Sequence, residues 1–140
     1  MQPSRIAWWL MGGKKKGRKF WSMQGTHRAT KLPYDSGLEK KFLDQCYMQG
    51  IKVVRCTVRV PYKDGDGKWH HYEPDFYLPD FDFVVEIKGS WAFKTNHAHV
   101  REKFYAAQTH FKGRYTLITE KELRTDFVAG LHKVLTDGRH

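Results

Sequence analysis

Residues 74–89, PDFYLPDFDFVVEIKG, constrain the fold more than any other segment, because they have the composition of buried strands and yet carry charges. Aromatic and β-branched residues dominate, as is typical of strands in a sheet core. Alternate side chains of a strand share a face, so Glu86 and Lys88 lie on one face, and the apolar residues between them on the other. A short turn at Pro79 would bring Asp75 beside them. We therefore expect a sheet on which two carboxylates and a lysine converge.

Such a cluster of charges favours a metal site. Two neighbouring carboxylates repel, and one pKa rises unless a cation lies between them. Mg²⁺ prefers oxygen ligands, and Lys88 could hold the attacking water. A metal neutralises the charge that develops on a phosphoryl group and supplies hydroxide, which suits phosphodiester hydrolysis. Alone, Glu86 and Lys88 would more often be an exposed ion pair, and Pro74-Asp75 a turn. Their combination favours the metal site.

The overall charge indicates a polyanionic partner. The 140-residue chain has 25 Lys and Arg against 15 Asp and Glu, a net charge of +10 and a pI near 9.7. Nucleic acid is the first expectation, with an anionic membrane surface as the competitor. No apolar run approaches the roughly 20 residues that span a bilayer, and we expect no signal peptide. Cys46 and Cys56 fit buried thiols of a reducing compartment, so we expect a soluble, cytoplasmic protein.

The chain divides into a basic arm, residues 1–33, and a folded domain, residues 34–140. The arm contains GGKKKGRK at positions 12–19 and shows no sustained helical or strand period. It is either a solvated mobile segment or an arm that docks on phosphates, with tryptophans that could stack on bases. The candidate phosphate contacts of the arm are Lys14, Lys15, Lys16, Arg18 and Lys19.

Residue patterns predict the element order α, β, β, β, α, β, α, which is a mixed α/β sheet domain. The first helix is capped by Asp35 or Ser36 and stopped by Gly50. The glycines of KDGDGK would close a hairpin. The predicted elements are a helix over 35–50, a strand over 51–62 ended by Pro61, a turn at 63–68, strands over 69–78 and 80–89, a helix over 96–111, a strand over 114–119 and a helix over 126–135.

Three blocks in this order, SGLEKKF, YEPDFYLP and VVEIKGSW, resemble the phage endonuclease I family, the junction-resolving enzymes of the PD-(D/E)xK nuclease superfamily. The likeness covers residues 35–91. It implies a restriction-endonuclease-like fold, a mixed β-sheet flanked by helices. It also implies that Asp75 and Glu86 bind metal, that Lys88 is the catalytic lysine, and that Ile87 contributes its carbonyl group. The implied cofactor is Mg²⁺, with Mn²⁺ as a substitute.

The resemblance gives a role to a fourth residue, Glu39. By its position alone it would be an ordinary exposed carboxylate, favoured in a first helical turn by the helix dipole. The family pattern instead implies that Glu39 reaches the metal site, directly or through water, as a catalytic residue that could assist a second ion.

The family likeness also implies an intertwined homodimer that cuts opposing strands of four-way DNA. The region 57–73 would then bridge the two halves, but KDGDGK departs from the family pattern, and a turn there would fold the strand back within one chain. We expect a Mg²⁺-dependent endonuclease that resolves branched DNA and leaves a 5′-phosphate and a 3′-hydroxyl. The alternatives are a nicking or end-cutting nuclease of the same fold, and a non-catalytic nucleic-acid-binding module.

Further DNA contacts are predicted after the last strand of the motif. The histidines of this chain lack the cysteine partners and the HExxH spacing of zinc sites, so we expect surface or phosphate-binding roles for them. Trp91 is expected to pack. The predicted DNA-binding residues here are Lys94, His97, His99, Arg101 and Lys103.

Overall fold

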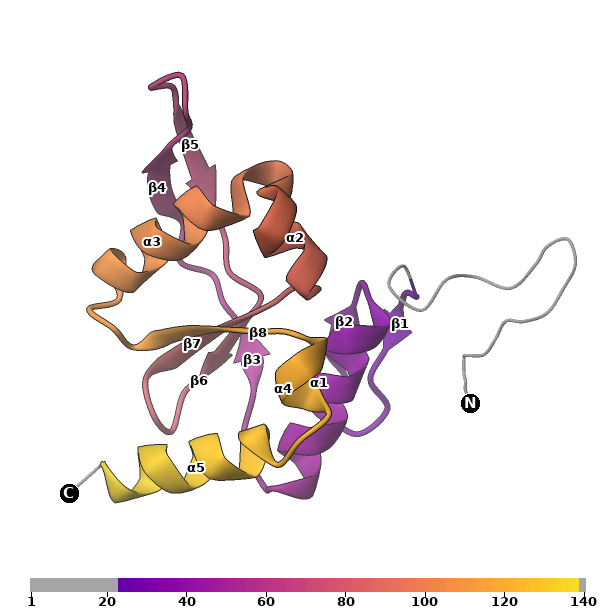
Figure 1. The fold of residues 1–140 in the computed structure, drawn as a ribbon. Coiled ribbons are helices and arrows are strands. Elements are labelled where there is room, and N and C mark those ends of the chain that lie inside the picture. The colour runs from indigo at the N-terminus through magenta and orange to yellow at the C-terminus, as the bar shows by residue number, and fades with distance from the viewer. Residues whose placement is uncertain (1–22, 139–140) are drawn as a thin grey trace, which may run out of the picture.

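A computed structural model describes residues 23–138, arranged around a four-stranded mixed sheet (Figure 1). Its order is β3-β6-β7-β8, with β7 antiparallel to β6 and parallel to β8. The expected mixed α/β class is confirmed, whereas the restriction-endonuclease-like arrangement stays a prediction. The strands of this sheet are β3 (Val54–Arg55), β6 (Phe76–Leu78), β7 (Phe83–Ile87) and β8 (Tyr115–Ile118).

Helices cover both faces of the sheet. Helices α1, α4 and α5 lie on one side, and α2 and α3 lie on the other, next to the β4–β5 hairpin (Figure 1). Parallel β7 and β8 are joined by the crossover through α2 and α3, as parallel pairs require. The helices are α1 (Gly37–Met48), α2 (Ser90–Thr95), the 3-10 turn η3 (His97–His99), α3 (Val100–His110), α4 (Glu120–Leu123) and α5 (Phe127–Asp137).

The two faces of β7 enter different cores. Val85 and Ile87 pack with Phe42 of α1 in the core beneath α1 and α5. Val84 lies in the second core, between the sheet and α3. Since side chains alternate along a strand, Glu86 shares the face of Val84, as the sequence predicted.

Helix α1 begins and ends as its sequence predicts. Ser36 is the N-cap, and its Oγ accepts a hydrogen bond from the Glu39 amide at 3.1 Å. Gly50 follows the helix with φ of +69°, a left-handed conformation that glycine adopts at little cost. The cap fixes Glu39 in the first turn, next to the central sheet.

The prediction of one continuous strand over 51–62 is wrong, because the chain forms β3 and then a separate strand, β4 (Val60–Lys63). Pro61 does not end the strand: it lies inside β4, opposite His71, in a two-stranded sheet where both strands are edges that tolerate proline. β4 pairs with β5 (Trp69–Tyr72) in a hairpin within one chain.

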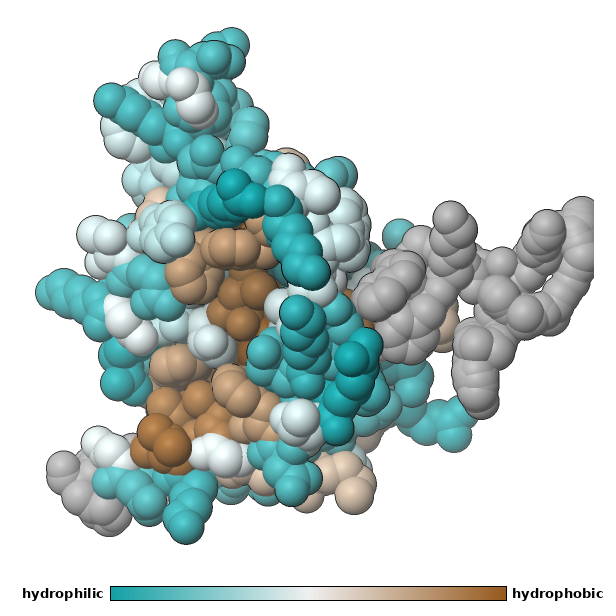
Figure 2. Space-filling view, in the orientation of Figure 1, coloured by the Kyte–Doolittle hydropathy of each residue, from teal (hydrophilic) through white to brown (hydrophobic). Residues whose placement is uncertain are grey.

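The predicted turn at 63–68 is confirmed. The Asp64 carboxylate accepts from the amides of Asp66 and Lys68, each at 2.9 Å, and Gly67 has φ of +80°. The hairpin projects beyond α2 and α3, and its tip is hydrophilic, whereas apolar side chains gather between α3 and α5 on the same face (Figure 2). Val134 of α5 is 66% exposed.

The strand predicted over 69–78 is also broken, at residues 73–75 between β5 and β6. Pro74 lacks an amide donor, and the Asp75 amide donates to the Glu86 side chain. Because of this break, the Asp75 amide is available to bind the Glu86 side chain.

The helix predicted over 96–111 starts later, at Val100, and is preceded by the unpredicted helix α2. Asn96, Ala98 and His99 all have positive φ, which interrupts the helix between α2 and α3. Helix α4 was also not predicted. The strand β8 and the helix α5 are confirmed, and Phe127 of α5 packs against the core.

The last part of the predicted arm contains a small antiparallel sheet of β1 (Gly25–Thr26) and β2 (Pro33–Tyr34). His27 is 5% exposed, and its Nε2 lies 2.7 Å from Asp44 Oδ1 of α1. The sheet is thereby fastened to the domain. The predicted phosphate contacts and tryptophans of the arm, residues 8–21, lie outside the described residues.

Both cysteines, Cys46 and Cys56, are free and buried, as expected. Burial raises the pKa of the Cys46 thiol to about 12. Across residues 23–138, none of the helices has the length and apolar character that a membrane span requires.

Candidate active site

The carboxylates of Asp75 and Glu86 meet where β6 begins and β7 ends. The Asp75 amide donates to Glu86 Oε1 at 3.0 Å, and the Ile87 amide donates to Asp75 Oδ2 at 2.8 Å. Glu86 is 6% exposed, and Asp75 is partly buried. Burial, and then the charge of Asp75, raise the pKa of Glu86 well above its usual value. Burial also raises the pKa of Asp75. Ionising both carboxyl groups is therefore unfavourable, and a bound cation would stabilise their ionised forms.

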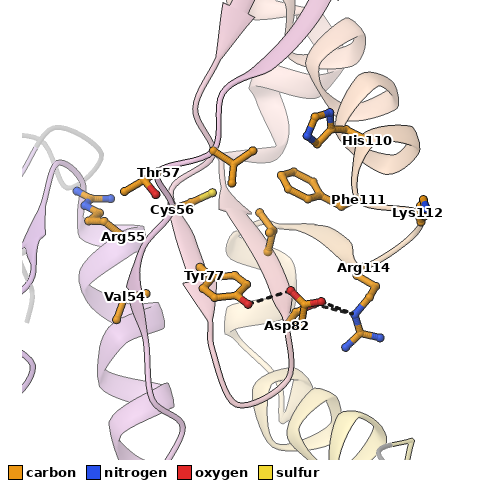
Figure 3. Close-up of a pocket in the computed structure, with 12 residues that line it drawn as sticks. Val54, Arg55, Cys56, Thr57, Tyr77, Asp82, His110, Phe111, Lys112 and Arg114 are labelled. Carbon is orange, nitrogen blue, oxygen red and sulfur yellow. Dashed lines mark hydrogen bonds and ion pairs between the residues drawn. The ribbon is translucent and has the colours of Figure 1, made fainter.

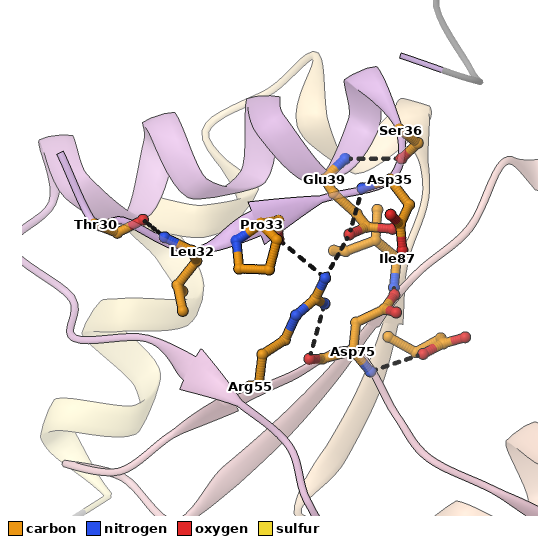
Figure 4. Close-up of polar contacts among 10 residues, drawn as sticks. Thr30, Leu32, Pro33, Asp35, Ser36, Glu39, Arg55, Asp75 and Ile87 are labelled. Carbon is orange, nitrogen blue, oxygen red and sulfur yellow. Dashed lines mark hydrogen bonds and ion pairs between the residues drawn. The ribbon is translucent and has the colours of Figure 1, made fainter. Parts of the chain in front are cut away.

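Glu39 approaches the pair from α1. It is 7% exposed, so it is not the exposed first-turn residue that its position alone suggested. Its Oε1 accepts from the Asp35 amide at 3.3 Å (Figure 4). Burial and then the charge of Asp75 raise the pKa of Glu39 to about 7. The structure thus brings Glu39 into the electrostatic environment of Asp75.

Lys88 completes the predicted set. Its Nζ lies 4.0 Å from Glu86 Oε2, and the side chain is 34% exposed. The Lys88 amide donates to the Ile118 carbonyl of β8 at 3.0 Å, which continues the parallel ladder beyond β7. One edge of the cluster is therefore a partly exposed ammonium group that solvent can reach.

Arg55 is a member of the cluster that the sequence reading missed. Its Nη2 lies 3.6 Å from Glu39 Oε1, and its Nη1 donates to the Asp75 carbonyl at 3.3 Å. The only sequence signal was an arginine inside an apolar, β-branched run. Its proximity to Asp75 depends on the register between β3 and β6, in which Arg55 pairs with Phe76.

Behind Glu86 lies a tyrosine pair that was also not predicted. Tyr72 Oη and Tyr115 Oη are 2.9 Å apart, and both side chains are buried. Burial, and then the charge of Glu86, raise the pKa of both phenols. Neutral hydroxyl groups therefore line the buried side of the cluster.

Lys103 of α3 lies next to the tyrosine pair. Its Nζ lies 5.6 Å from the centroid of the Tyr72 ring. Burial and then the neighbouring charge of Lys88 lower the pKa of Lys103, while the charges of Glu86 and Asp75 raise it. Lys103, one of the predicted DNA contacts, therefore shares an electrostatic environment with the carboxylates.

The family model of phage endonuclease I matches residues 20–111, more than half of the chain. The chain belongs to the phage endonuclease I family. No curated protein and no solved structure matches it. The matched range includes all four predicted catalytic residues, Glu39, Asp75, Glu86 and Lys88, which the fold brings to one place.

Endonuclease is the activity that the family indicates. In this member of the phage endonuclease I family, Asp75 and Glu86 offer carboxylate oxygens, which are the ligands that Mg²⁺ prefers. Mg²⁺ commonly binds only one or two carboxylates and keeps several water ligands. Burial raises the pKa of both groups, and a bound cation would favour their ionised forms. Among residues 23–138, no three His, Cys, Asp or Glu side chains are grouped as a metal cluster. Two carboxylates are a suitable ligand set for a magnesium ion that keeps several of its water ligands.

Glu120 connects α4 to the segment that follows β7. The Ser90 amide donates to Glu120 Oε1 at 2.8 Å, and Ser90 Oγ donates to Glu120 Oε2. Ser90 lies two residues after Lys88, and Glu120 lies beyond the range that the family model matches. No motif marked this contact, since it joins residues 30 apart in the chain.

The other predicted DNA contacts are used differently. Arg101 Nε donates to the Phe93 carbonyl at 2.8 Å, so its guanidinium caps α2. His99 Nδ1 lies 3.2 Å from Tyr62 Oη, and the ring of His97 contacts that of Trp91, which is 50% exposed rather than packed inside.

A separate cavity of about 750 Å³ lies between β3 and the end of α3 (Figure 3). Arg55 reaches its wall, but none of the four predicted catalytic residues belongs to its described lining, so it is not the candidate active site. The lining residues are Val54, Arg55, Cys56, Thr57, Val58, Tyr77, Asp82, Val84, His110, Phe111, Lys112 and Arg114.

Proposed function

We propose that the protein is a Mg²⁺-dependent endonuclease that resolves four-way (Holliday) and other branched DNA junctions by hydrolysing phosphodiester bonds. The observation that carries this proposal is the convergence of Asp75, Glu86, Lys88 and Glu39 in a member of an endonuclease family. The chain's charge of +10 supports a DNA substrate.

In this proposal, Asp75, Glu86 and the Ile87 carbonyl hold the divalent ion, for which Mn²⁺ can substitute. When bound, the ion supplies charge neutralisation at the phosphate and lowers the pKa of a bound water. The chain's own contribution is orientation, because the backbone amides of Asp75 and Ile87 fix the two carboxylates.

The lysines act on the reacting phosphate. Lys88 holds the attacking water and places a positive charge beside the scissile group, 4.0 Å from Glu86. Lys103 adds a second positive charge from α3, while Lys94 on the exposed surface of α2 contacts the DNA backbone farther away. Attack by water in line with the leaving oxygen gives a 5′-phosphate and a 3′-hydroxyl.

We further propose that a homodimer presents two such sites to opposing strands of a junction. The β4–β5 hairpin folds back within one chain, so this dimer does not require exchange of that hairpin. Light scattering of the purified chain, alone and with a junction, measures the stoichiometry, and one chain per junction during cleavage would contradict a dimer.

The deciding experiment compares a synthetic four-way junction with linear, nicked and forked duplexes of the same sequence, in Mg²⁺ and in excess EDTA. We expect preferential cutting of the junction and no cutting in EDTA. Equal or preferred cutting of nicked or linear duplex would indicate a nicking or end-cutting nuclease. Binding without product at any metal concentration would indicate a non-catalytic module.

A further inference from the structure

A groove of about 630 Å³ lies between the β4–β5 hairpin and α3, and none of the four predicted catalytic residues is in its described lining. The hairpin stands next to α3 on one side of the central sheet (Figure 1). Glu102, Tyr105 and Thr109 line the groove from α3, and their spacing places them on one helical face. Lys63 and Trp69 line it from the hairpin. Its volume is within the range of ligand-binding pockets.

Two large aromatic side chains are exposed in this groove. Trp69 and Tyr105 are each 62% exposed. A single exposed aromatic residue needs no explanation, but two that line the same concave surface indicate a binding surface. Lys63 pairs with Trp69 across the hairpin, and its Nζ lies 5.2 Å from the centroid of the Trp69 ring. The groove therefore combines aromatic rings with a positive charge.

Contacts within the protein hold the walls of the groove in place. The buried ring of Tyr62 stacks on the ring of His70, with centroids 5.2 Å apart. Tyr62 Oη lies 3.2 Å from Nδ1 of His99, the residue before α3, which fastens the hairpin to that helix. The ring of Tyr105 meets the ring of Phe104 edge-on, at 5.2 Å. A groove formed in advance lowers the entropy cost of binding a ligand.

The charges around the groove suit a neutral ring inside it and phosphate groups outside it. Glu102 accepts a hydrogen bond from Asn96 Nδ2 at 2.9 Å, and this bond lowers the pKa of Glu102, so the carboxylate stays ionised. Its negative charge offsets that of Lys63 and disfavours a phosphate in the groove. Lys68 is exposed at the tip of the hairpin, outside the described lining, where it can contact phosphates.

The groove lies a short distance from the candidate active site. Trp69 and Tyr72 are the two ends of β5, so they are about 10 Å apart along the strand. Burial, and then the charge of Glu86, raise the pKa of Tyr72, which places the inner end of β5 beside the carboxylates. Successive nucleotides of a duplex strand rise about 3.4 Å, so 10 Å corresponds to about three nucleotides.

We propose that this groove binds an unpaired nucleobase of the DNA, about three nucleotides from the phosphate that is cut, and that the base stacks on Trp69 and Tyr105. Stacking on aromatic side chains tolerates any base, so the groove reads no sequence. It reads the presence of an unpaired base, which branched DNA offers and a linear duplex does not. The inference rests on the proposed function, to which it adds a reason for the choice of branched DNA.

The test compares two labelled single-stranded oligonucleotides of equal length by fluorescence anisotropy, with the purified full chain in EDTA. One strand contains only thymidines, and the other has the same phosphates but lacks the bases of its central nucleotides. We expect the wild type to bind the thymidine strand at least about fivefold more tightly. Trp69→Ala should bind both strands within about twofold, whereas Trp69→Phe should keep the preference. The matched control is His71→Ala, an exposed residue of the same hairpin outside the described lining, which should also keep it.

Equal binding of both strands by the wild type would show contacts to phosphates alone, would leave the groove to another kind of ligand, and would overturn the inference. A folded Trp69→Ala that kept the full preference would overturn it as well. Should Trp69→Ala fail to fold by circular dichroism, Tyr105→Ala decides by the same criterion. Junction cleavage by a wild type without any base preference defeats this inference alone. A base preference without cleavage of any DNA in Mg²⁺ defeats the proposed function alone.

Discussion

Asp75 and Glu86 orient each other's carboxylates through the backbones of their strands. The Asp75 amide donates to Glu86 Oε1 at 3.0 Å, and the amide after Glu86, that of Ile87, donates to Asp75 Oδ2 at 2.8 Å. The carboxylates therefore need little rearrangement to receive a ligand, and this reduces the entropy cost of binding. The arrangement depends on the break in the chain between β5 and β6, which frees the Asp75 amide from the strand ladder.

Replacing either carboxylate by its amide should remove activity without unfolding the protein. Asp75→Asn and Glu86→Gln keep the side-chain shape but lose the charge, so we expect junction cleavage in Mg²⁺ to fall at least about 100-fold. Junction binding, measured by gel shift in Ca²⁺, should persist. Asp80→Asn, in the exposed turn after β6, is the matched control. Wild-type cleavage by either variant would remove that residue from the catalytic set.

Lys88→Ala should lower kcat and leave KM nearly unchanged, because the ammonium group lies next to Glu86 and contributes little of the total DNA contact. We expect single-turnover cleavage to fall by about 100-fold or more. Lys94→Ala, on the exposed surface of α2, should raise KM instead and reduce the salt dependence of binding. If both variants changed only KM, Lys88 would be a DNA contact and not a catalytic residue.

The metal-free protein should lose stability as the pH rises. Glu39 has a pKa of about 7 in the folded chain against an ordinary value of 4.5, so between these pH values the folded state binds more protons than the unfolded state. The free energy of unfolding therefore falls as the pH rises through this window. The raised pKa values of Asp75 and Glu86 act in the same direction.

Urea denaturation in EDTA at pH 5 and pH 8 measures this difference. Glu39→Gln should remove much of it and should be more stable than the wild type at pH 8. Excess Mn²⁺ should restore stability to the wild type at pH 8, because it binds the folded carboxylates. Higher stability of the metal-free wild type at pH 8 than at pH 5 would show that these carboxylates are not destabilised when they ionise.

The contact between Glu120 and Ser90 should position Lys88 without taking part in chemistry. Glu120→Gln and Ser90→Ala should each lower kcat several-fold, and the double variant should be no worse than the stronger single one, because both variants weaken the same contact between Ser90 Oγ and the Glu120 carboxylate. Mn²⁺ affinity should stay unchanged, since neither residue touches Asp75 or Glu86. Additive losses would show that the two residues act independently.

The sequence predicted those parts of the fold that depend on local patterns. The Ser36 cap, the alternation along β7 and the turn around Asp64 are each set by residues a few positions apart, and each was confirmed. The breaks at residues 56–59 and 73–75 were missed, because β-branched or aromatic residues lie on both sides of each break. Which strand each segment pairs with depends on distant segments, which propensity does not record.

The same distinction applies to the site. Asp75, Glu86 and Lys88 lie on adjacent strands, so alternation and a short turn were enough to predict that they converge. The position of Glu39 came from the family resemblance, because a carboxylate in a first helical turn has a sufficient local explanation. Arg55 had no signal beyond its place in an apolar run, and Glu120 had none, since their contacts depend on tertiary packing across 20 and 30 residues of chain.

The residues of the charged cluster come from separate segments of the chain, so the cluster forms only after these segments have folded together. Glu39 comes from α1, Arg55 from β3, Asp75 from the start of β6 and Glu86 from β7, and these segments meet only when the antiparallel strands have paired. The β6–β7 hairpin is local, but β3 pairs with the more distant β6, and non-local pairing forms late because the entropy cost of loop closure comes before the contacts. A chain released early from the ribosome, or cut by a protease within these segments, would therefore lack the complete cluster of charges.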